Sequence, residues 1–265
     1  MSRGKQYKVA LAFAVAVSFT ERGASAQAVV SMPKWQGGVA FDAPVRDALR
    51  APTEGQRNVA DDASTVLLAA LLVAPYGTAA AHTVRLHGSF WDAAGLWLVN
   101  SEALGVALLA TQLTKGAAGR ERPFATAEGL ATTCESHPSD PKCGSDRNAS
   151  FFSGHSAMAF TGAGLLCTQQ IFFGPRGADA LGCVGGMLAA TATAMLRIVA
   201  DMHYASDTLV GAAIGLGAGM LLPYILHFAP WAPLPIAKKS PLVGLHLTPW
   251  GGPGGGGIAI GAQFQ

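Results

Sequence analysis

The chain has 265 residues, of which 50% are hydrophobic and only 13% are charged, and its formal net charge is +2. A chain so poor in charge either buries an unusually large surface or lies in lipid. Its cations are few and dispersed, with no basic stripe interleaved with aromatic residues, so we expect no nucleic-acid partner. Nothing in the sequence indicates an obligatory protein partner either.

Residues 1–26 have the pattern of a secretory signal peptide. Arg3, Lys5 and Lys8 precede an apolar stretch over residues 9–19 that is too short to span a bilayer, and a small-residue cleavage site follows. An uncleaved amphiphilic anchor is the alternative, and both interpretations predict export from the cytoplasm. A polar segment over residues 27–64 comes next.

Five apolar segments with almost no internal charge follow, at residues 65–81, 93–113, 155–173, 180–200 and 208–228. Each is long enough to cross a hydrocarbon core of ~30 Å as a helix that rises ~1.5 Å per residue. The segments are apolar around the whole circumference, which predicts an all-α bundle of about five long helices over residues 65–230. A transmembrane bundle is favoured over a soluble domain with a buried helix pair. Small residues such as Gly211, Gly215, Gly217 and Gly219 would let helix backbones approach closely.

The signal peptide also predicts the orientation of five spans, because it leaves the new N-terminus outside the membrane. The loops 114–154 and 201–207 then lie outside, whereas the linkers 82–92 and 174–179 lie inside together with the C-terminal tail. This arrangement places the polar motifs described below on one face of the membrane.

The four cysteines are expected to be of two kinds. Cys134 and Cys143 lie in a polar stretch of an oxidising compartment, so a disulfide between them is favoured. In the chain-entropy model it would stabilise the loop by roughly 2 to 3 kcal/mol. A free thiol pair or a metal site is the alternative. Cys167 and Cys183 lie within apolar segments and are expected to be small core residues rather than reactive thiols.

Two polar motifs flank the second and third apolar segments. Lys115 and Arg122 follow the second segment, where cations serve either as interfacial anchors or as ligands of an anion. Ser153, Gly154 and His155 open the third, so a hydroxyl, a glycine amide and an imidazole lie at a predicted helix N-terminus. Unpaired N–H groups and the helix dipole favour anion binding there, and helix capping by Ser153 is the simpler alternative.

A third motif joins the fourth and fifth segments and consists of Arg197, His203 and Asp207. If His203 begins the last helix, Asp207 lies one turn further on the same face and accepts a hydrogen bond from the imidazole. That bond would leave the other ring nitrogen free to attack phosphorus. A metal site or a satisfied polar pair is the alternative, and we assign no role to the nearby Asp201.

The order K-x6-R-P, S-G-H and R-x5-H-x3-D, with each motif at the edge of an apolar segment, resembles the type 2 phosphatidic acid phosphatase and vanadium haloperoxidase superfamily, in its bacterial membrane-associated lipid phosphatase branch. Bacterial class A acid phosphatases and glucose-6-phosphatase-like enzymes also belong to this superfamily. The resemblance covers roughly residues 65–228. Phe152 replaces the usual proline before S-G-H, and Leu196 replaces the usual serine before the arginine. Neither residue carries the implied chemistry, so we expect a changed pocket shape rather than lost activity.

The resemblance implies a role for each motif residue. Five residues would bind the substrate phosphate, namely Lys115, Arg122, Ser153, Gly154 and Arg197. His203 would attack phosphorus and Asp207 would orient it, while His155 would protonate the leaving oxygen and later activate water. No metal or other cofactor is expected, because the cations and the helix N-terminus neutralise the developing charge.

Together, the motifs and the resemblance predict a metal-independent phosphatase that hydrolyses a phosphomonoester or diphosphate of a lipid through a phosphohistidine intermediate. The expected partners are a phosphorylated lipid and the lipid of a bacterial inner membrane, with the site facing the periplasm. The alternatives are a soluble periplasmic acid phosphatase for small phosphomonoesters, a vanadium-dependent haloperoxidase and a non-catalytic protein that binds lipid phosphates. The presence of both His203 and Asp207 argues against the last of these.

Residues 231–265 form a glycine-rich tail. Two strand-like stretches surround the glycine-rich turn at residues 251–257, which is typical of a β-hairpin. An isolated hairpin is marginal in water, so it would have to pack on the rest of the chain. A hairpin and a flexible tail are both compatible with this sequence.

Overall fold

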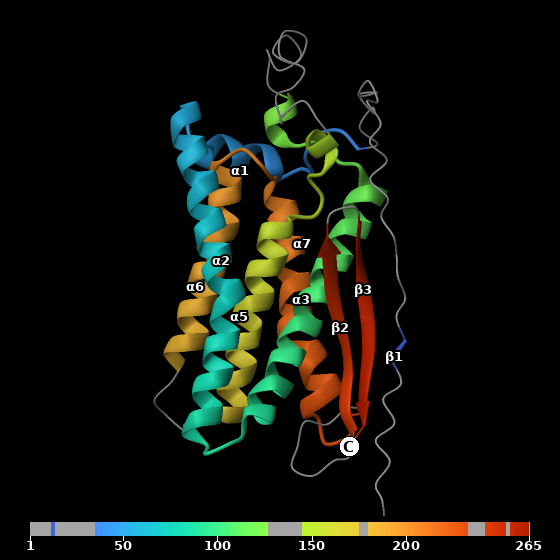
Figure 1. The fold of residues 1–265 in the computed structure, drawn as a ribbon. Coiled ribbons are helices and arrows are strands. Elements are labelled where there is room, and N and C mark those ends of the chain that lie inside the picture. The colour runs from blue at the N-terminus through green and yellow to red at the C-terminus, as the bar shows by residue number, and fades with distance from the viewer. Residues whose placement is uncertain are drawn as a thin grey trace, which may run out of the picture.

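The computed structural model describes residues 12–13, 35–126, 145–174, 180–232, 242–252 and 255–264. Its main feature is an up-and-down bundle of long helices (Figure 1), which are α2 (Glu54–Arg85), α3 (Phe90–Ala118), α5 (Gly154–Phe173), α6 (Ala180–Val199) and α7 (Ala205–Leu216). The last helix continues through two π-helical turns, η4 (Gly217–Leu221) and η5 (Tyr224–Phe228). The predicted helical bundle is confirmed.

The end of the bundle at which α2 begins also carries the short elements (Figure 1). These are α1 (Asp42–Leu49), η1 (Pro123–Thr126) and η3 (Ser145–Asn148). Helix α2 begins at Glu54, ahead of the apolar segment predicted from residue 65, because Thr53 and Gln56 form a capping box. The first turns of α2 are therefore polar, and they lie at the same end as α1.

Helix α5 is the centre of the bundle, because it packs against α2, α3, α6 and α7. Glycines allow the closest of these contacts: a Cβ atom at Gly215 would lie 2.3 Å from the carbonyl oxygen of Ala157, and one at Gly219 would lie equally close to a carbonyl oxygen of α5. The predicted close approach holds at Gly211 as well. It is wrong for Gly217, since a Cβ atom there would meet nothing within 4 Å.

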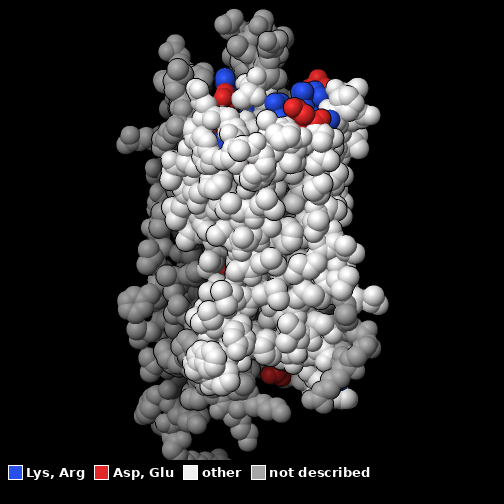
Figure 2. All heavy atoms as spheres, turned by 180° about the vertical axis from the view of Figure 1, so that it is seen from behind, with Lys and Arg blue, Asp and Glu red and all other residues white. Residues whose placement is uncertain are grey.

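Four of the described helical stretches are long and apolar enough to cross a membrane, namely α2, α3, α6 and residues 205–228. Large apolar side chains are exposed on their outer faces, including those of Val66, Leu113, Leu188 and Ile225. Figure 2 shows that charged side chains gather at one end of the molecule, while the flank next to them is almost free of charge. The central α5 is not among the four, and its buried face includes polar side chains such as Gln169.

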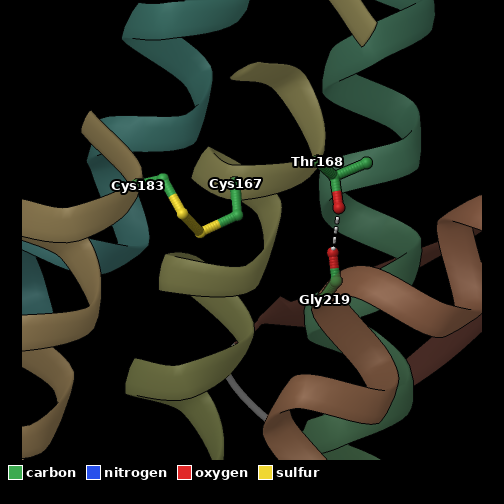
Figure 3. The surroundings of a disulfide bond; sticks show 4 residues. All are labelled: Cys167, Thr168, Cys183 and Gly219. Carbon is green, nitrogen blue, oxygen red and sulfur yellow. Dashed lines mark hydrogen bonds between the residues drawn. A yellow bond between two sulfur atoms is a disulfide. The ribbon is translucent and has the colours of Figure 1, made fainter. Parts of the chain in front are cut away.

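A disulfide joins α5 to α6, between Cys167 and Cys183 (Figure 3). The expectation that these two cysteines are merely small core residues is therefore wrong. The two helices form an antiparallel hairpin, which brings the Cα atoms of the cysteines to 4.4 Å from each other. On its other side, α5 is tied to η4 by a hydrogen bond from Thr168 to the carbonyl oxygen of Gly219 (Figure 3). The predicted pair Cys134 and Cys143 lies outside the described residues.

The glycine-rich tail contains two antiparallel strands, β2 (Leu242–Gly252) and β3 (Gly255–Phe264). Strand β2 lies against α3, so the tail runs along the bundle instead of extending beyond its end (Figure 1). The short strand β1 (Ala12–Phe13) pairs with β3. Apart from these two residues, the predicted signal peptide lies outside the described part of the chain.

Candidate functional site

The predicted site residues come together at one end of the bundle. Because helices that follow one another in the chain are antiparallel, the last turns of α3 and α6 lie at the same end of the bundle as the first turns of α5 and α7 (Figure 1). These turns carry Lys115 on α3, Gly154 and His155 on α5, Arg197 on α6 and Asp207 on α7.

The N-terminus of α5 provides the candidate phosphate-binding part of the site. Ser153 is the N-cap residue, and its Oγ accepts a hydrogen bond from the backbone N–H of Ser156 at 3.3 Å. The ammonium group of Lys115 lies over the first turn, 3.8 Å from the position that a Cβ atom of Gly154 would occupy. A cation above a helix N-terminus creates a local positive potential that suits a phosphate group.

Helix α2 contributes a polar side chain that contacts His155. The Oγ1 of Thr65 lies 3.3 Å from Nε2 of the His155 imidazole, which is half-buried. This contact fixes the orientation of the imidazole that is predicted to transfer protons. Thr65 was not predicted as a site residue.

Helix α2 also holds the cation of α6. The guanidinium of Arg197 forms an ion pair with Asp61 and lies 3.2 Å from the Oγ of Ser64. Arg197 is 3% exposed, whereas Asp61 is 39% exposed. Asp61 and Ser64 were not predicted either, although their spacing of three residues places them on one helix face, and polar residues at that spacing are a detectable signal.

His203 is buried among the cations of the site. Its side chain is only 1% exposed, and its pKa is lowered well below the ordinary value of 6.5, first by burial and then by the positive charges of Arg122, Arg197 and Lys115. His155 lowers this pKa further. The imidazole of His203 is therefore neutral near pH 7, which is the form that can act as a nucleophile.

The predicted hydrogen bond from His203 to Asp207 is not formed in this structure. The Nδ1 atom of His203 lies 3.7 Å from Oδ2 of Asp207, and it has no hydrogen-bond partner among the residues that the structure describes. Asp207 instead accepts hydrogen bonds from the Oγ of Ser150 at 2.5 Å and the backbone N–H of Tyr204 at 3.0 Å. These contacts hold the carboxylate beside the neutral ring.

Arg120 is the cation that forms an ion pair with Asp207, and it was not predicted as a site residue. Its Nη1 lies 2.5 Å from Oδ1 of Asp207, and its Nη2 lies 2.8 Å from Oδ2 of Asp42. The fully buried guanidinium is held between the rings of Trp35 and Tyr204, at 4.1 Å and 4.3 Å from their centroids. The K-x6-R-P spacing selects Arg122, so Arg120, inside the variable stretch of the motif, was assigned no role.

Helix α1 is anchored to the loop that carries His203. Asp201 accepts a hydrogen bond from Nε of Arg46 at 2.6 Å, and it forms an ion pair with Arg50, whose Nε lies 2.8 Å away. Asp201 has a left-handed backbone conformation with φ of 62°, at the turn that leads from α6 into the loop. Its place in the structure is thus an anchor for α1 next to the site.

The assembled site is suited to a tetrahedral oxyanion. Three cations, a helix N-terminus and a hydroxyl surround a neutral imidazole, and a second imidazole lies at the side facing α2. Among the described residues, no group of three or more His, Cys, Asp or Glu side chains is arranged to hold a metal ion.

Comparison with known proteins gives one match. Residues 94–231, just over half of the 265-residue chain, match the model of the PAP2 superfamily. No curated protein and no solved structure matches the chain. The matched residues include the three motifs, whereas α1 and α2 precede them. The chain therefore belongs to the PAP2 superfamily, which indicates a phosphatase or a related activity.

Proposed function

We propose that the protein is a metal-independent phosphatase that hydrolyses a phosphomonoester or diphosphate of a lipid through a phosphohistidine intermediate. The observation that carries this proposal is the buried imidazole of His203, which is kept neutral beside Lys115, Arg122 and Arg197 at a helix N-terminus. A nucleophile without charge, surrounded by cations, is suited to attack a negatively charged phosphoryl group.

In the first step, Nε2 of His203, the ring nitrogen that does not face Asp207, forms a bond to phosphorus, and the bond from phosphorus to the leaving oxygen breaks. His155 donates a proton to that oxygen. The three cations, Ser153 and the amide of Gly154 bind the phosphoryl oxygens, while the carboxylate of Asp207 stabilises the positive charge that develops on the His203 ring, 3.7 Å away.

In the second step, a water molecule attacks the phosphohistidine. His155 accepts a proton from this water, the bond between phosphorus and nitrogen breaks, and inorganic phosphate leaves. The His203 ring returns to its neutral state, and His155 returns to its protonated state. The contact between Thr65 and His155 keeps the second imidazole on the α2 side of the site in both steps.

The apolar flank of the bundle supports a lipid substrate. Four helical stretches have the length and composition of membrane spans, and the site lies at one end of the bundle that they form. A phosphate at that level belongs to a lipid whose chains lie along the bundle in the bilayer. The signal-peptide pattern supports a periplasmic orientation of this end at the inner membrane.

The test is phosphate release in detergent with excess chelator, from phosphatidate, an isoprenyl diphosphate and a soluble phosphomonoester. We expect His203→Ala to reduce kcat by on the order of a thousandfold or more, because it removes the nucleophile. The matched control is His87→Asn, which changes an exposed histidine at the far end of the bundle and should retain wild-type activity.

The outcomes separate the candidate functions. Preference for phosphatidate or the diphosphate supports the lipid phosphatase, and preference for the soluble ester supports the acid phosphatase. Equal release by wild type and His203→Ala contradicts the proposed nucleophile. If the wild type releases phosphate from none of the three, the phosphatase proposal fails, and halide oxidation in the presence of vanadate is the next activity to measure.

A further inference from the structure

Arg120 is fully buried although it is charged, and it lies between two carboxylates. It binds Asp207 at 2.5 Å on one side and Asp42 at 2.8 Å on the other. Asp42 also accepts hydrogen bonds from the backbone N–H and the Oγ of Ser206, at 2.8 Å and 2.7 Å. The row of Asp42, Arg120 and Asp207 thus connects α1 with the first turn of α7, and it contains two negative charges and one positive charge.

This row ends beside the proposed nucleophile. Asp207 gives one oxygen to Arg120 and the other to Ser150, and it is the carboxylate that lies 3.7 Å from Nδ1 of His203. The positive charge of Arg120 offsets part of the negative charge that Asp207 presents to the His203 ring. Asp42 in turn offsets part of the positive charge of Arg120. Because these side chains are buried, their charges act strongly on one another.

Four other ionisable groups, from α3, α5, α6 and the loop after α3, also act on His203. Lys115 comes from α3, Arg122 from the loop after α3, His155 from α5 and Arg197 from α6. All four disfavour a positive charge on the His203 ring. The carboxylates of the row therefore supply the opposing negative charge that a phosphorylated ring needs.

We propose that Arg120 and Asp42 are positioning residues of the active site, which hold Asp207 in place and set the negative charge that it presents to His203. This inference rests on the proposed function, in which His203 becomes positively charged during catalysis. The inference makes α1 part of the active site, although α1 lies outside the residues that match the superfamily.

A purely structural role is the competing explanation, in which the row only attaches α1 to the bundle. Helix α1 already has separate attachments, because Arg46 and Arg50 bind Asp201. A structural role predicts that loss of Asp42 lowers the stability of the fold and does not specifically lower the proton affinity of His203. The two explanations therefore differ in a measurable property of one imidazole.

The experiment measures the proton affinity of His203 by NMR of the full chain in detergent, labelled with isotopic histidine. The His203 signal is identified by its absence from His203→Ala. Asp42→Asn removes one negative charge with little change in shape, and we expect the proton affinity of His203 to fall about threefold or more. The control Asp47→Asn removes the charge of an exposed residue on the same helix and should leave the titration unchanged.

Arg120→Gln should shift the titration in the opposite direction, because Asp42 and Asp207 then lose their shared counter-charge. This variant also keeps the inference testable where Asp42→Asn does not fold. Opposite shifts do not arise from a general loosening of the structure. If the folded variants titrate like the wild type, the inference is overturned and the row is only an anchor.

Phosphate release is measured on the same samples. Asp42→Asn should lower kcat by about ten- to a hundredfold with KM little changed, which is the range observed when outer hydrogen-bonding partners are removed from metal sites. If the wild type releases no phosphate, the proposed function fails, while the titration of His203 still decides the role of the row.

Discussion

At the scale of single residues, one cation of the site already has a carboxylate partner. Arg197, which we propose to bind phosphate, forms an ion pair with Asp61. A substrate phosphate must compete with this carboxylate for the guanidinium. Because Asp61 is 39% exposed, water screens the ion pair, and the competition costs only a modest part of the binding free energy.

We therefore predict that Asp61→Asn lowers KM by up to about fivefold, since an ion pair with an exposed partner contributes ~0.2–1 kcal/mol. The value of kcat should change little, because Asp61 does not contact the reacting groups. The measurement is initial-rate kinetics with the preferred substrate, with Asp62→Asn as the matched control, since Asp62 is the exposed neighbour. An increase in KM for Asp61→Asn would show that this carboxylate supports substrate binding.

At the scale of helices, the contact between α5 and α7 positions the site. Ser153 at the start of α5 donates its backbone N–H to the carbonyl oxygen of Asp207 on α7, at 3.1 Å. Further along, Gly215 brings the two backbones together, since a Cβ atom there would lie 2.3 Å from the carbonyl oxygen of Ala157. A change in this contact therefore moves the phosphate-binding turn relative to the catalytic loop.

Gly215→Ala should destabilise the protein by about 1–3 kcal/mol, the usual cost of overpacking, and should reduce activity as α7 moves away from α5. Gly217→Ala is the matched control, because its Cβ atom meets nothing within 4 Å, and it should be neutral or slightly stabilising. Thermal unfolding in detergent and phosphate release measure the two effects. Equal behaviour of both variants would contradict the proposed contact.

At the scale of the whole molecule, charge and apolar surface are segregated. Charged side chains gather at the end that carries the site, and the flank of the bundle is almost free of them (Figure 2). Exposed apolar side chains lie along α2, α3, α6 and α7. A water-soluble protein rarely exposes so large a continuous apolar surface, whereas a bilayer covers it at no cost.

We predict that the expressed chain stays in the membrane fraction after washes with high salt and alkaline carbonate, and that only detergent releases it. Salt removes proteins that are held by charge, and carbonate removes those enclosed in vesicles, so resistance to both indicates embedding in the bilayer. A periplasmic soluble enzyme from the same cells is the control. Recovery of active protein without detergent would instead favour the soluble acid phosphatase.

Much of the fold could be predicted because it depends on local composition. Continuous apolar segments specify buried or lipid-facing helices wherever they occur, and all five predicted segments coincide with helices of the bundle, apart from residue 200. The start of α2 was missed, since the capping residues Thr53 and Gln56 precede a polar stretch without an apolar period. The Cys167–Cys183 disulfide was missed because it requires the register of α5 against α6, which the two apolar patterns do not specify.

The sequence by itself determined the bundle, the superfamily and the three motifs, because each depends on residue types at short, regular spacings. Only the tertiary structure decided the partners of those motifs: Arg120 rather than His203 holds Asp207, and Asp61 holds Arg197. The partners Asp42 and Arg120 are 78 positions apart in the chain. Contacts at such separations depend on how whole helices pack, so they cannot be predicted from the residue pattern of one segment.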